Sequence, residues 1–173
     1  NCVKTMQSVW SKDYHPNLGP TTSSKNGPEI LAGAVGPKAM EMSSDFAAGL
    51  AGFSFNADIE EIKDSFNRVN EAFMKKNKTP RLVTSFWFGL GEEARSDIQI
   101  HLERYLSWMG EDLAKDLAKT AGFSGSQDEL VDFLQLIKAA GATDVILVPT
   151  SKNIEQLILA EEVITEFNQN LTN

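Results

Sequence analysis

The sequence predicts an α/β protein in which parallel strands are covered by helices. Short and nearly continuous apolar runs recur along the chain, as expected for strands that are buried on both faces. Between them lie longer stretches in which apolar residues recur every three or four positions, the pattern of amphipathic helices. Because the two patterns alternate, they indicate repeated strand–helix units and hence a parallel sheet.

Four strands are expected, over residues 29–34, 51–55, 81–89 and 144–148. Four parallel strands with covering helices form either a small open doubly wound sheet or half of a closed barrel, and periodicity does not separate the two. Consecutive strand–helix units favour the barrel, since an open sheet usually carries a nucleotide fingerprint at its first turn and GxGxxG does not occur here.

The helices between these strands have recognisable starts and ends. Pro37 suits the first turn of a helix over 37–47, and Asn56 or Asp58 caps the next one. Ser126 and Glu129 have the spacing of a capping box, and Gly141 ends the helix that they begin. Further helices are expected over 92–109, with a continuation through residue 117, and from about 154 onward.

The composition is that of a globular acidic protein. Of the 173 residues 42% are hydrophobic, enough for one domain with a sizeable core. The net charge of -8 repels phosphate backbones and anionic lipids, so nucleic acids and membranes are not expected partners. The single cysteine, Cys2, forms no internal disulfide, in agreement with a cytoplasmic protein.

The beginning of the sequence is unusual. It opens at Asn1 inside a helical stripe of Val3, Met6 and Trp10, which suggests a natural chain that starts earlier; a short mature protein with a processed N-terminus is the alternative. Residues 11–28 then form a long loop rich in Pro, Gly, Ser and Thr. This loop, which contains His15, is either an active-site lid or a solvated connector.

The segment that follows the first strand has the composition of a phosphate-binding turn. Small residues from Gly33 to Gly36 precede a helix that opens with Pro37 and Lys38. The amides of such a turn, the positive end of the helix dipole and the ammonium group together suit a phosphate monoester. The alternative is that the glycines serve only backbone geometry.

Other groups offer weaker indications of chemistry. Phe86, Trp87 and Phe88 reach the carboxyl end of their strand, where they line a pocket or, as is more common, belong to the core. By alternation, Trp87 faces away from the other two. His101 lies on a helix surface. No triad and no cluster with metal-ligand spacing is apparent, so no metal is expected.

Two stretches together resemble the luciferase-like family of flavin and deazaflavin oxidoreductases. The first, ILAGAVGPKAMEMSSDFAAGLAGFSF, looks like the family's fifth and sixth strands, with a small-residue turn and a GPK-like helix start. The second is GFSGSQDELVDFLQLIKAAGATDVILVPTSKNIEQLILAEEV, which looks like the end of the family's barrel. No single motif is diagnostic, and the resemblance lies in their order and spacing.

The resemblance implies the C-terminal half of a TIM (β/α)8 barrel, strands five to eight over 29–173, with the N-terminal half absent from this chain. It implies an oxidoreductase or monooxygenase with a small-molecule substrate. The cofactor is flavin mononucleotide (FMN) or, alternatively, a reduced deazaflavin, with its phosphate on the turn after the first strand present. The family positions that match this turn are Gly33, Ala34, Val35, Gly36 and Lys38.

Two departures and one alternative accompany this expectation. Bacterial luciferase has hydroxyl side chains in the turn, so backbone amides and Lys38 must contribute more here; Ala48 or Gly49 also replaces an aspartate common in relatives. Most residues that touch the ring come from strands one to four, so no catalytic residue is assigned. The alternative is a non-catalytic flavin-binding or self-associating half-barrel protein, which covers its edges as a homodimer or with a complementary half-barrel.

Overall fold

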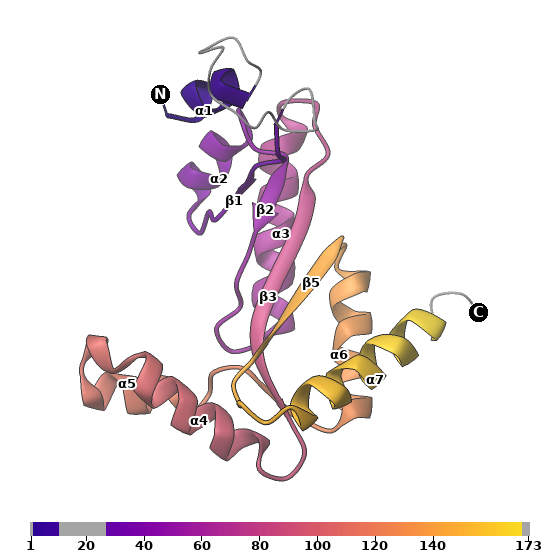
Figure 1. The fold of residues 1–173 in the computed structure, drawn as a ribbon. Helices are drawn as coiled ribbons and strands as arrows, with labels where there is room; N and C mark the ends of the chain where they lie inside the picture. The colour runs from indigo at the N-terminus through magenta and orange to yellow at the C-terminus, as the bar shows by residue number, and fades with distance from the viewer. Residues whose placement is uncertain (1, 11–26, 171–173) are drawn as a thin grey trace.

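The computed structural model describes residues 2–10 and 27–170, and its centre is a parallel sheet (Figure 1). In the described residues this sheet has five strands: β1 (Leu31–Ala32), β2 (Gly49–Ala51), β3 (Arg81–Leu90), β4 (Phe123–Gly125) and β5 (Asp144–Pro149). All pairings are parallel, as the sequence predicted. The long strand β3 is central and spans the sheet from end to end.

The four predicted strands lie next to one another in sequence order. β1 pairs with β2, β2 with β3, and the opposite edge of β3 pairs with β5 from Val83↔Asp144 to Phe88↔Pro149. The short β4 lies beside the carboxyl end of β3. Successive units of a (β/α) barrel have this order. In a doubly wound sheet, by contrast, the order of the strands reverses part of the way across the sheet. The expectation of barrel-type strand–helix units is therefore confirmed.

Helices cover the two faces of the sheet differently. On one face lie α3 (Ile59–Met74), α6 (Gln127–Ala139) and α7 (Glu155–Asn170), which enclose the main core. Its largest fully buried side chains include Phe66, Phe73, Phe86 and Phe88. On the opposite face, α4 (Ala94–Tyr105), a 3-10 turn (Ser107–Met109) and α5 (Glu111–Ala118) pack around Trp87. Figure 1 shows α4 and α5 projecting from the carboxyl end of β3.

Local capping explains where two of the helices begin. Asp58, rather than Asn56, caps α3: its carboxylate accepts from the amides of Glu60 and Glu61. Ser126 and Glu129 form the predicted capping box at α6. Gly141 follows the end of α6 with φ +101°, a conformation that glycine adopts without strain.

The first two strands and the first covering helix differ from the predicted ranges. β1 has only two residues because the amide of Ala34 bonds back to the carbonyl of Ala32, 3.1 Å away, instead of a neighbouring strand. The helix predicted over 37–47 is α2 (Pro37–Ser43). It ends early because the chain turns into β2, where the amide of Ala48 donates to the carbonyl of Ile30.

Other differences concern the carboxyl end of the sheet. β2 starts two residues before the predicted strand, and its pairing with β3 continues through the amides of Gly52 and Ser54, which donate to Val83 and Ser85. The helix predicted over 92–109 divides into α4 and the 3-10 turn. β4 was not predicted, because three residues carry no apolar pattern of their own.

The N-terminal stripe forms α1 (Cys2–Trp10), as expected. The predicted loop lies, from residue 11 to 26, outside the described residues, and so does His15. Across the part of the chain that is described, no helix is long and apolar enough to cross a membrane.

Candidate functional site

The turn between β1 and α2 is built mainly from backbone. Ala34 is buried, whereas Val35 is 89% exposed and Gly36 and Lys38 also face outward. Gly36 stands at the N-cap with φ −93° and ψ 156°, and no side chain caps the first turn of α2. The amides at the start of α2 therefore lack the side-chain partner that Asp58 and Ser126 give to α3 and α6.

The glycines of this turn are not required by the backbone. Neither Gly33 nor Gly36 has a positive φ. A Cβ atom on Gly33 would come no closer than 4.0 Å to the carbonyl of Ala51, and one on Gly36 would meet nothing within 4 Å. By contrast, a Cβ on Gly49 would lie 1.9 Å from the carbonyl oxygen of Arg81. The interpretation that these two glycines serve only backbone geometry is thus not supported by the fold.

A pocket of about 410 Å³ opens beside the turn, between β1, β2 and α3. Three of the five predicted cofactor-binding residues, Gly33, Ala34 and Val35, line it, and Gly36 and Lys38 do not. The other lining residues come from α2, β2 and the segment after it, α3 and β3: Met40, Ala51, Gly52, Phe53, Ser54, Glu61, Ile62, Asp64, Ser65, Phe66, Arg68 and Thr84.

Polar side chains on the far wall of this pocket are held by local bonds. The buried hydroxyl of Ser54 donates to Glu61 Oε2 over 2.8 Å and accepts from the amide of Asp58. Arg68 pairs with Asp64 one turn away on α3. Arg68 was not predicted as a site residue, because it lies beside the apolar stripe of α3, where a solvated cation is ordinary.

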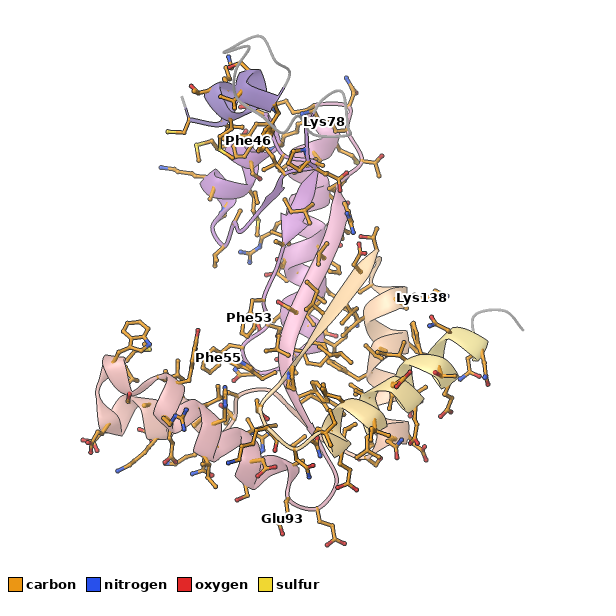
Figure 2. All side chains as sticks on the ribbon, viewed as in Figure 1. Phe46, Phe53, Phe55, Lys78, Glu93 and Lys138 are labelled. Atoms are coloured by element: carbon orange, nitrogen blue, oxygen red, sulfur yellow. The ribbon has the colours of Figure 1, made fainter. Side chains whose placement is uncertain are left out.

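A row of aromatic side chains lies on the face opposite α3, α6 and α7. Trp87 contacts Phe53 and Phe55 edge to face, with ring centroids 4.6 Å and 5.2 Å apart, and Tyr105 at 6.1 Å. His101 stacks on Tyr105. Figure 2 shows Phe53 and Phe55 on the segment after β2, on the side of the sheet where α4 and α5 lie. Phe53 and Tyr105 are 45% and 59% exposed, so the row presents aromatic surface to solvent.

The three aromatic residues at the end of β3 are core residues, the more common of the two predicted roles. Phe86 and Phe88 belong to the core under the helices. Trp87 faces the other way, as alternation predicted, and is only 8% exposed beneath α4 and α5. The exposed members of the row, Phe53 and Tyr105, come from other elements and were not predicted.

Two arginines with electrostatic effects lie away from both the turn and the aromatic row. Arg81, at the amino end of β3, lowers the pKa of Asp144 to about 2 through two hydrogen bonds. Burial lowers the pKa of Arg95, whose guanidinium donates to the carbonyls of Ala121 and Gly122 before β4. Both arginines join segments of the fold, so their roles are structural.

Comparison with known proteins gives matches among solved structures. An F420-dependent secondary alcohol dehydrogenase, solved with an F420–acetone adduct, superposes on 93% of this chain with a TM-score of 0.66 and 14% identity. A coenzyme F420-dependent tetrahydromethanopterin reductase from Methanopyrus kandleri superposes on 78% of this chain with a TM-score of 0.55 and 15% identity. A monooxygenase from Streptomyces bottropensis superposes on 89% of this chain with a TM-score of 0.55 and 16% identity. No protein-family model matches the sequence, and neither does any curated protein.

These three proteins are luciferase-like oxidoreductases, the group that the sequence resembles, and the chain shares their barrel-type α/β fold. At identities of 14 to 16% the likeness is one of fold. The chain spans 58%, 50% and 51% of the lengths of these proteins.

Proposed function

We propose that this chain is part of a flavin- or deazaflavin-dependent oxidoreductase and that the turn after β1 binds the cofactor phosphate. The observation that supports this most is the open space at Gly33 and Gly36, where the fold itself makes no demand for glycine. A glycine without an internal role suits a backbone that a ligand approaches closely. Two of the similar structures are named as F420-dependent and one as a monooxygenase.

In this proposal the residues of the turn make different contributions to binding. The backbone amides of Lys38 and Ala39 donate to the phosphate oxygens, since Pro37 has no N–H. Lys38, which makes no ion pair among the described residues, also supplies the positive charge. Ala34 anchors the turn to the core. FMN and the deazaflavin cofactor F420 each carry a phosphate group on the side chain attached to the ring. When bound, the cofactor supplies redox chemistry that amino-acid side chains lack.

A second candidate function rests on surface that the fold leaves uncovered. Ile146 of β5, which pairs with Ser85, is 55% exposed on the same face as Phe53. In the described part of the chain, β5 also pairs only with β3 and keeps a free edge. Free edges and exposed apolar faces favour association. The alternative is therefore a non-catalytic half-barrel that associates with itself or with a complementary half-barrel.

Titration with FMN and, separately, with F420 tests the first proposal. Binding of either is followed by cofactor fluorescence for the wild type, Lys38→Gln and the control Lys75→Gln, an exposed lysine at the end of α3. We expect Lys38→Gln to weaken binding by about fivefold or more and Lys75→Gln to leave it unchanged. Equal affinities for all three proteins would contradict phosphate binding at this turn.

Sedimentation and the cofactor titration together separate a cofactor-binding chain from one that only self-associates. A protein that forms dimers at micromolar concentration and binds neither cofactor would favour the self-associating half-barrel. A protein that binds FMN or F420, whatever its oligomeric state, would rule out a half-barrel that only self-associates.

A further inference from the structure

A second pocket, of about 540 Å³, lies between α4 and the segment after β5. Its position is the carboxyl end of β3 and β5, the end at which enzymes with barrel-type sheets bind their substrates. It shares no lining residue with the pocket beside the 33–38 turn. Its volume falls within the range of about 300–1,000 Å³ that is usual for small-molecule sites.

One wall of this pocket is the exposed and mainly polar face of α4, on which Ile100 is the apolar lining residue. Asp97, His101 and Arg104 are spaced by four and three residues, which places them on one side of the helix. The opposite side of α4 carries Ile98 and Leu102, which are fully buried around Trp87. The packing of the apolar side thus fixes the direction in which the polar side points.

The other wall is the segment Thr150, Ser151 and Lys152. The buried hydroxyl of Thr150 donates to the carbonyl of Phe88 over 3.0 Å. Ser151 Oγ accepts from the amide of Asn153, which leaves its own proton free to donate to a ligand. A segment held in this way loses little conformational entropy when it binds a ligand.

A side-chain clamp fixes the start of α7 just beyond this wall. The amide side chain of Gln156 makes two bonds to the backbone of Leu90, at 2.8 and 2.9 Å. The segment after β5 is therefore tied to the end of β3 on both sides of Lys152.

The charges of the two walls suit an anion. In the described residues neither Arg104 nor Lys152 forms an ion pair, whereas Lys63, Arg68, Lys76, Arg81 and Lys119 all do. Asp97 is the one carboxylate among the lining residues. It lies two helical turns from Arg104, about 10 Å along the axis, and does not neutralise it. The pocket thus has more positive than negative side chains in a protein of net charge -8.

We propose that this pocket binds the anionic group, a phosphate or a carboxylate, of a small-molecule substrate. Arg104 and Lys152 contribute charge, and the Ser151 hydroxyl donates a hydrogen bond. The exposed ring of His101, stacked on Tyr105, connects the pocket to the aromatic row around Trp87. Calling the ligand a substrate rests on the proposed function, whereas the anion site itself does not.

Titration with inorganic phosphate at constant ionic strength, followed by ¹H–¹⁵N spectra, tests the site. We expect saturable shifts at the amides of Ser151 and Lys152. Arg104→Gln and Lys152→Gln should each weaken binding by about fivefold, the upper range for exposed charge pairs. The control Lys115→Gln, an exposed cation on α5 outside the pocket, should not change it. Because all three side chains are exposed, the fold should persist, and the same spectra verify this.

The variant Lys38→Gln distinguishes failure of this proposal from failure of the proposed function. One outcome is that phosphate shifts only the amide signals of residues 33–38 and that only Lys38→Gln weakens phosphate binding. In that case the pocket at α4 is not an anion site, and the cofactor proposal gains support. If Arg104→Gln and Lys152→Gln weaken phosphate binding while FMN and F420 do not bind, the anion site stands without the cofactor. Acetate in place of phosphate should shift the same amides; no response to either anion would overturn the proposal.

Discussion

The guanidinium of Arg81 holds the carboxylate of Asp144 with two parallel hydrogen bonds, Nε to Oδ2 and Nη2 to Oδ1, each 2.8 Å long. A third nitrogen of Arg81 donates to Glu29 over 2.8 Å. Arg81 begins β3 and Asp144 begins β5, so the amino ends of two paired strands are joined by this contact.

Replacement of Asp144 by Asn should make the free energy of unfolding depend less on pH in the acid range. The pKa of Asp144 is about 2 in the folded protein and 3.8 without its partners, so its contribution is present above pH 3.8 and lost as the pH falls through 2. Since the pair is partly exposed, Asp144→Asn should cost at most about 1 kcal/mol at pH 7. Urea unfolding between pH 7 and 2 measures the difference in the free energy of unfolding between this variant and the wild type, with the exposed Asp132→Asn as the control. A difference in the free energy of unfolding between wild type and Asp144→Asn that is as large at pH 2 as at pH 7 would argue against the pair.

Trp87 should be the main attachment of α4 and α5 to the sheet. It is 8% exposed and its ring contacts Phe53, Phe55 and Tyr105. Trp87→Ala should destabilise the protein by about 3–5 kcal/mol, as expected for deletion of a buried aromatic side chain. Trp108→Ala, at a site 78% exposed, should change the stability by less than about 0.5 kcal/mol. Similar unfolding midpoints for the two variants would contradict this assignment.

Gly36→Ala should separate folding from ligand binding. A Cβ at residue 36 meets nothing within 4 Å and φ is −93°, so stability should be unchanged or raised by up to about 1 kcal/mol. The same methyl group reduces the space for a phosphate, and FMN or F420 binding should weaken. Gly49→Ala is the contrast, because its Cβ would lie 1.9 Å from Arg81 O and should prevent normal folding. Unchanged cofactor affinity in Gly36→Ala would speak against the proposed site.

Features that depend on local chemistry were predictable from the sequence. The capping box of Ser126 and Glu129 and the Asp58 cap are interactions within three residues, and the stripe of α3 shows its buried face directly. Repeated strand–helix units favoured the observed strand order over that of an open doubly wound sheet. The early end of α2 was not predictable, because it depends on the bond between Ala48 and Ile30 across the sheet.

The same contrast holds for the two candidate sites: one is formed by residues adjacent in the sequence, and the other by residues that only the fold brings together. The turn after β1 could be proposed as a site from the sequence because glycine, proline and lysine are adjacent there. The pocket between α4 and β5 was not, because Arg104 and Lys152 are 48 residues apart and only the pairing of β3 with β5 brings their elements together. Trp87 and Tyr105 likewise meet only once α4 folds back on the sheet.

The most direct test of the cofactor proposal is to map where FMN contacts the protein. In ¹H–¹⁵N spectra of the wild type, we expect added FMN to shift the amides of Gly33, Ala34, Val35, Gly36 and Lys38, with riboflavin, which lacks the phosphate, shifting them much less. Shifts confined to other parts of the protein, or equal shifts with riboflavin, would contradict a phosphate site on the turn after β1.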